Sequence, residues 1–103
     1  MTEIKYTIND DEFSIVAEGH ADYAERGKDI VCAGISCLLQ TLIMHVDAQA
    51  HITEGRVYCY KKGSEYTECA RMCITGLKAL ECTYRGHLKV SEGCPIIRDF
   101  NLQ

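Results

Sequence analysis

Apolar and polar residues alternate in two short segments near the start of the chain. Residues 3–8 and 12–18 each carry an apolar side chain at every second position, which predicts two β-strands. Between them, Asn9-Asp10-Asp11 is a strong turn signal. This part of the chain therefore predicts an antiparallel hairpin.

The apolar spacing becomes helical after a polar loop at residues 20–28. From about Asp29 to Asp47, apolar residues recur every three or four positions, and Asp29 is a good N-cap because its carboxylate can accept from free backbone N–H groups. The apolar arc is wide, so we expect a sheet to cover one side of this helix and a partner subunit the other.

The second half of the chain repeats the hairpin and helix and adds a strand. We expect strands at 49–54 and 56–62 around the Glu54-Gly55 turn, a helix capped by Ser64 or Thr67, and a last strand at 86–91. The order ββαββαβ predicts an α+β fold, a mostly antiparallel sheet with two packed helices. Residues 1–103 are expected to form one domain with its core at about 3–91. In the unassigned tail 92–103, Ile96, Ile97 and Phe100 either add a short strand or pack on the surface.

Charge and cysteine content narrow the functional classes. The net charge is −4 and the 11 basic residues are scattered, which argues against nucleic acid as a partner. The apolar run Ile30–Val46 is shorter than the ~20 residues that a membrane span needs, and the start of the chain lacks a secretory pattern. Seven cysteines, an odd number, indicate reduced thiols in a cytoplasmic protein rather than a disulfide framework.

Cys32 is the best candidate for chemistry. A cysteine nucleophile acts as a thiolate, and both a helix N-terminus and a neighbouring imidazolium favour that form. Cys32 lies about three residues inside the predicted helix, and His20 lies twelve residues earlier, before a loop that can fold back. Taken alone, the residues favour the alternative in which Cys32 is a core residue and His20 an ordinary loop histidine.

The remaining histidines and cysteines give weaker signals. His45 is expected in the core or an interface, whereas His51 and His87 are expected at the surface of strands. Cys69 and Cys73 share one helix face, but a structural zinc site needs four ligands, so we expect core packing and no metal. Nucleotide-binding and zinc-protease motifs are missing from the sequence, and no cofactor is expected.

The segment from Gly19 to Ser36 resembles the ribosomal-processing cysteine protease family. The matching residues are Gly19-His20-Ala21, then Gly27, then Asp29-Ile30-Val31-Cys32-Ala33, then Ser36. They match the pattern of that family, which is a G-H-A segment, a variable loop and a G-x-D-x-V-C-A-x-x-S segment that begins a helix. Residue types, spacing and helix position all agree. This agreement now favours a reactive Cys32 paired with His20 over a core cysteine and an ordinary loop histidine.

The resemblance implies a dimeric endopeptidase that removes the N-terminal extension of large-subunit ribosomal protein twenty-seven. It makes Cys32 the nucleophile and His20 the general base, with Asp29, Ser36, Gly19 and Gly27 in supporting positions. We expect Asp29 to cap the helix rather than orient His20. Ser36 either bonds near the site or bonds a carbonyl within its helix. We also expect first-turn N–H groups near Cys32 to serve as oxyanion donors and the loop 21–28 to be mobile.

Two other functional classes remain open from the sequence. One is a non-catalytic interaction module of ribosome assembly with buried cysteines, and another is a thiol-based redox sensor, which the lack of a C-x-x-C motif weakens. A phage-borne relative that processes capsid proteins is an alternative within the peptidase class.

Overall fold

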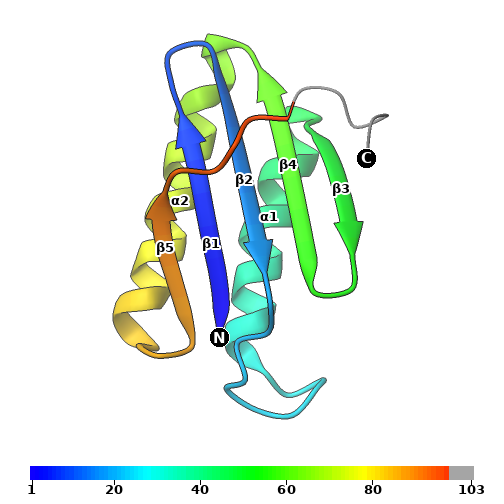
Figure 1. Ribbon diagram of the computed structural model, residues 1–103, viewed down its shortest axis with the longest axis vertical. Coiled ribbons are helices and arrows are strands. Elements are labelled where there is room, and N and C mark those ends of the chain that lie inside the picture. Colours follow the sequence, from blue (N-terminus) through cyan, green and yellow to red (C-terminus); the bar gives the residue numbers. More distant parts are fainter. Residues whose placement is uncertain (98–103) are drawn as a thin grey trace.

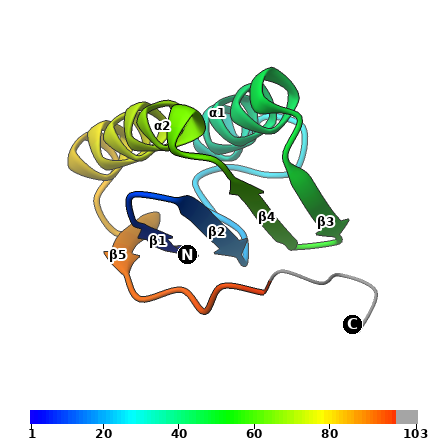
Figure 2. The same ribbon diagram turned by 90° about the horizontal axis from the view of Figure 1, so that it is seen from above.

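The computed structural model describes residues 1–97, which form a five-stranded sheet with both helices on one face (Figure 1, Figure 2). The elements are β1 (Thr2–Ile8), β2 (Glu12–Glu18), α1 (Ile30–Val46), β3 (Gln49–Thr53), β4 (Arg56–Lys62), α2 (Ser64–Thr83) and β5 (Leu88–Glu92). Their order is ββαββαβ, which confirms the predicted fold class.

The strands lie in the order β3-β4-β2-β1-β5. The pairs β1–β2, β2–β4 and β3–β4 are antiparallel, whereas β1 and β5 run parallel, so the sheet is mostly antiparallel as predicted. Because of these directions, the end of β2 lies beside the starts of β1 and β5. The loop after β2 leads from this end of the sheet into α1 (Figure 1).

The central strand β2 is buried on both faces. Phe13 and Ile15 are fully buried in the core beneath the helices, and Val16 lies on the opposite face against Tyr58. The predicted alternation of β2 is therefore correct, but its second face is covered as well. That cover is a segment to which the sequence pattern assigned no structure.

Residues 93–97 cross the face of the sheet opposite the helices (Figure 2). The Tyr58 hydroxyl accepts a hydrogen bond from the Ile97 N–H at 2.5 Å, and Ile96 and Ile97 pack against the apolar residues of that face. Of the two alternatives for the tail, surface packing is the one that the structure shows for these two residues. Phe100 lies outside the described residues.

The two helices approach closely at two glycines. A Cβ at Gly76 would lie 3.0 Å from a methyl group of Leu38, and one at Gly34 would lie 3.2 Å from a methyl group of Leu80. Each glycine costs helix propensity, roughly 1 kcal/mol relative to alanine, but leaves room for the leucine of the other helix. This contact fixes α1, and with it Cys32, against the rest of the core.

Three details differ from the sequence-based expectations. The N-cap of α2 is Gly63, which provides no side-chain hydrogen bond, so Ser64 and Thr67 were both wrong as caps. His45 is exposed on the last turn of α1, which rules out the core, while its place in an interface stays a prediction. β5 begins at Leu88, so His87 lies in the preceding turn and not on a strand.

Among residues 1–97, no helix is long and apolar enough to cross a membrane.

Candidate active site

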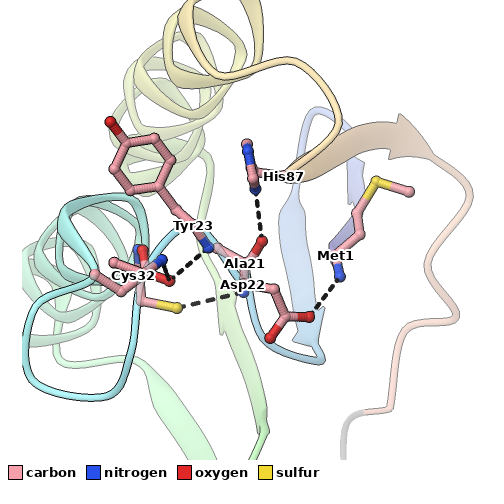
Figure 3. A network of polar contacts seen from close by, with 8 residues as sticks. Met1, Ala21, Asp22, Tyr23, Cys32 and His87 are labelled. Atoms are coloured by element: carbon pink, nitrogen blue, oxygen red, sulfur yellow. Dashed lines mark hydrogen bonds and ion pairs between the residues drawn. The ribbon is translucent and has the colours of Figure 1, made fainter.

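Cys32 lies in the first turn of α1, at the end of the sheet where β2 finishes. Its side chain is half-buried, and the backbone N–H of Ala21 donates a hydrogen bond to its Sγ at 3.4 Å (Figure 3). Ala21 follows His20 directly in the chain. The loop therefore folds back onto the helix start, as the candidate Cys–His pair requires.

Asp29 caps α1 and also holds the loop. Its Oδ1 accepts from the N–H groups of Val31 at 3.0 Å and Cys32 at 2.9 Å, while its Oδ2 accepts from Tyr23 at 2.9 Å and Ala24 at 3.3 Å. Desolvation acts to raise the pKa of this carboxyl, but the four N–H donors outweigh it, and the pKa is lowered. These contacts match the capping role and involve no bond to His20.

The same contacts correct the expected oxyanion donors. The N–H groups of Val31 and Cys32 already donate to Asp29, and the N–H of Ala33 donates to the Asp29 carbonyl at 3.1 Å. First-turn donors next to Cys32 are therefore occupied in this structure. The N–H that faces the sulfur comes from the loop, at Ala21.

Gly19 shapes the turn that presents His20. Its φ is +91°, and a Cβ there would lie 2.7 Å from the backbone oxygen of Met1, so a larger residue would have to displace the backbone just before β1. Its N–H donates to the Gly55 carbonyl at 2.8 Å, which ties the turn to the β3–β4 hairpin. His20 Nε2 lies 3.5 Å from where a Gly55 Cβ would be, so the exposed imidazole rests beside that hairpin. Gly27 also has a positive φ, +88°, within the loop.

Two adjoining open clefts, of about 530 and 520 Å³, meet at these residues. Five side chains line both: His20, Cys32, Ser36, Arg26 and Glu54. Arg26 of the loop and Glu54 of the hairpin form a long, exposed ion pair at 3.9 Å. The larger cleft continues between α1 and the β3–β4 hairpin, where Ile35, Leu39, Ile43 and Val57 give it an apolar wall.

His20 and Cys32 share both clefts, but no hydrogen bond joins them in the described part of the chain. This is the arrangement expected of a free protein in which a movement of His20 completes the pair. Ser36, exposed one turn after Cys32, faces the same clefts. The catalytic and supporting roles of these residues stay predictions.

The other thiols range from buried to exposed, with Cys69 in between. Burial raises the pKa of Cys59 to about 12 and that of Cys73 to about 11, so both stay protonated at neutral pH. Cys37 and Cys82 are exposed, and all seven cysteines are free.

Among residues 1–97, no group of three or more His, Cys, Asp or Glu side chains could hold a metal ion.

His87 is the site-region residue that the sequence did not indicate. It is partly buried in the turn before β5, and its Nδ1 lies 2.9 Å from the Ala21 carbonyl. Its ring also meets Tyr23 edge to face, with 5.3 Å between ring centroids. The two residues of this hydrogen bond are 66 positions apart, and no local pattern could have paired them.

A small α+β domain with a half-buried thiol in the first turn of a helix, and a histidine in the same clefts, defines a candidate cysteine hydrolase. The family model "Cysteine protease Prp" matches residues 1–89, so the chain belongs to the Prp cysteine protease family. This confirms the family resemblance drawn from the segment Gly19 to Ser36.

Individual relatives support the same assignment over shorter stretches. The ribosomal processing cysteine protease Prp of Staphylococcus aureus is 44% identical over 41 residues, 38% of this chain and 39% of the relative. The Mycoplasma genitalium protein of the same name is 56% identical over 32 residues, 31% of this chain and 32% of the relative. The matched stretches thus span less than half the length of these curated relatives.

Solved structures share the fold. The crystal structure of the S. aureus ribosomal processing protease Prp with a covalently linked product peptide superposes with a TM-score of 0.80 at 21% identity, covering 90% of this chain and all of that one. A second S. aureus structure, with a substrate peptide, gives 0.75 at 20% identity, with the same two coverages. SMU.848 from Streptococcus mutans gives 0.65 at 18% identity over 89% of this chain and 93% of that one.

Proposed function

We propose that this protein is an endopeptidase that removes the N-terminal extension of a large-subunit ribosomal protein, number twenty-seven, with Cys32 as nucleophile and His20 as general base. The observation that carries the proposal is the position of Cys32: a half-buried thiol in the first turn of α1, with His20 in the same two clefts. The names of the S. aureus and M. genitalium relatives supply the ribosomal context.

The proposed reaction has two covalent steps. His20 takes the proton from Cys32, and the sulfur attacks the carbonyl carbon of the scissile peptide. His20 then gives that proton to the leaving amine, and water hydrolyses the thioester to release the acyl product. Because no hydrogen bond joins the pair within residues 1–97, the side chain of His20 would have to move to bring the imidazole to the sulfur.

The substrate is proposed to lie extended in the larger cleft. This cleft runs from Cys32 along α1 to the β3–β4 hairpin, and β3 is an edge strand. An edge strand offers backbone groups to a peptide in extended conformation. The apolar wall formed by Ile35, Leu39 and Ile43 favours apolar substrate side chains near the cleaved bond.

The decisive test is cleavage of a synthetic peptide that spans the extension and its cleavage site. The variant Cys32→Ala should lose at least about a thousandfold in rate, because the covalent step has no nucleophile. Cys37→Ala is the matched control, since Cys37 is exposed on the same helix and should be dispensable. Full activity in Cys32→Ala, at an unchanged melting temperature, would refute the peptidase proposal.

We also propose that the protein works as a cytoplasmic homodimer. The free cysteines fit a reducing compartment, and α1 exposes apolar side chains, with Ile30 56% and Met44 80% accessible. An uncovered side of α1 suits a second subunit. Sedimentation equilibrium should show a dimer that Met44→Lys weakens; a monomer at all concentrations would exclude it.

A further inference from the structure

Ala21 is held through both of its backbone polar groups. Its N–H donates to Cys32 Sγ at 3.4 Å, and its carbonyl lies 2.9 Å from Nδ1 of His87 (Figure 3). The residue is 1% exposed and belongs to the core. Ala21 is also the residue after His20, so anything that fixes Ala21 fixes the chain that carries the proposed base.

His87 is a firm anchor because its own backbone is bonded on both sides. Its N–H donates to the Tyr84 carbonyl at 3.1 Å, and its carbonyl accepts from the Thr2 N–H at 3.0 Å. The ring packs edge to face on Tyr23, and Tyr23 makes a second such contact with Tyr84. The turn before β5 therefore supports the loop from the side opposite to α1.

The direction of the His87 bond follows from the chemistry of its partner. A backbone carbonyl only accepts, so Nδ1 must carry the proton. His87 thus acts as a hydrogen-bond donor to the loop through Nδ1.

We propose that His87 is a positioning residue for the proposed peptidase reaction: it holds the Ala21 carbonyl, so that the Ala21 N–H faces Cys32 Sγ and His20 enters the cleft from a fixed backbone. This inference rests on the proposed function, but the hydrogen bonds that carry it are independent of the substrate. Small displacements of reacting groups are costly, since about 1 Å can lower a rate roughly a hundredfold.

Three substitutions separate the hydrogen bond from the bulk of the ring. His87→Asn places an amide N–H near the position of Nδ1, His87→Gln places one near Nε2, and His87→Leu removes the donor. In cleavage of the extension peptide, His87→Leu and His87→Gln should lose about ten- to a hundredfold in kcat, with KM changed by less than about threefold. His87→Asn should stay within about threefold of the wild type.

A second measurement is independent of the substrate. Iodoacetamide alkylation, followed residue by residue by mass spectrometry, should show a several-fold change in the Cys32 rate in His87→Leu and a near wild-type rate in His87→Asn. The exposed Cys37 and Cys82 are internal controls, which should not change in any variant.

The outcomes are distinguishable. If the wild type cleaves no extension peptide, the proposed function fails, whereas the alkylation series still decides the role of His87. The positioning role is overturned if His87→Asn falls as far as His87→Leu, or if His87→Leu keeps wild-type kcat and Cys32 reactivity. If His87→Leu does not fold, as judged by circular dichroism, the Asn and Gln variants still test the role. Both side chains are polar, but only His87→Asn should keep wild-type activity.

Discussion

Cys32 at the start of α1 and the pair Cys59 and Cys73 in the core carry the same side chain in opposite surroundings. Cys32 is half-buried, lines two clefts and receives an N–H from the loop. Cys59 on β4 and Cys73 on α2 are packed among apolar residues, and burial raises the pKa of Cys59 to about 12 and of Cys73 to about 11.

The difference shows that burial, not the number of cysteines, decides which thiols are accessible. A thiol enclosed in apolar surroundings keeps its proton and behaves as a small apolar residue. A thiol at a helix start, beside a loop, can meet a substrate and a base. The two regions should therefore respond differently to alkylation, to a core substitution and to loss of the helix cap.

Alkylation should give the largest contrast. Unfolding in guanidinium should speed the reaction of Cys59 with iodoacetamide by at least about a thousandfold, because its pKa falls from about 12 toward the ordinary value of about 8.5. The reaction of Cys73, whose pKa in the folded protein is about 11, should become at least about a hundredfold faster for the same reason. Cys32 should react in the folded protein, as pulse alkylation and peptide mass spectrometry will show. A folded-state rate for Cys59 equal to that of Cys32 would remove the distinction.

A cavity in the core should lower stability without changing the site. Leu77 is fully buried on α2, and Leu77→Ala should lower the free energy of unfolding by about 2–5 kcal/mol. At temperatures where the variant is still folded, Cys32 alkylation should match the wild type. Met72→Ala, at a residue 75% exposed on the same helix, is the control and should change stability little. A slowed Cys32 in folded Leu77→Ala would mean that the two regions are coupled.

Removal of the cap should have the smallest effect on stability but should act directly on the site. Asp29→Ala should cost about 1 kcal/mol and release the loop. Because the pKa of Asp29 is lowered on folding, its contribution is complete above its ordinary pKa of 3.8 and is lost as pH falls through the lower folded value.

Thermal melts at pH 7 and in acid can check this. The melting temperatures of wild type and Asp29→Ala should differ at pH 7, and should converge as the pH falls from 3.8 through the lower folded pKa of Asp29. Asp29→Asn is the matched control, since it keeps one acceptor oxygen and removes the titration. A gap that persists unchanged in acid would show that the carboxylate charge does not contribute.

Much of the fold could be predicted because its signals are local. The alternation in β1 and β2 and the helical spacing of α1 each reflect one buried face, which a single element reveals. The cap of α2 could not be predicted, because Ser64 and Thr67 are good capping types while the structure uses Gly63 without a side-chain bond. The burial of the second face of β2 depends on residues 93–97, whose path is set by distant partners such as Tyr58.

For the site, the sequence by itself determined the candidate pair and the helix start at which it lies. His20, Asp29 and Cys32 lie within one short segment, and residue type and spacing place the thiol at a helix start. Only the tertiary structure decided which thiols are buried, that Asp29 occupies the first-turn donors, and that His87 reaches Ala21. The physical reason is that hydrogen bonds and burial between distant segments exist only once the sheet brings β2, β5 and α1 to one end of the molecule.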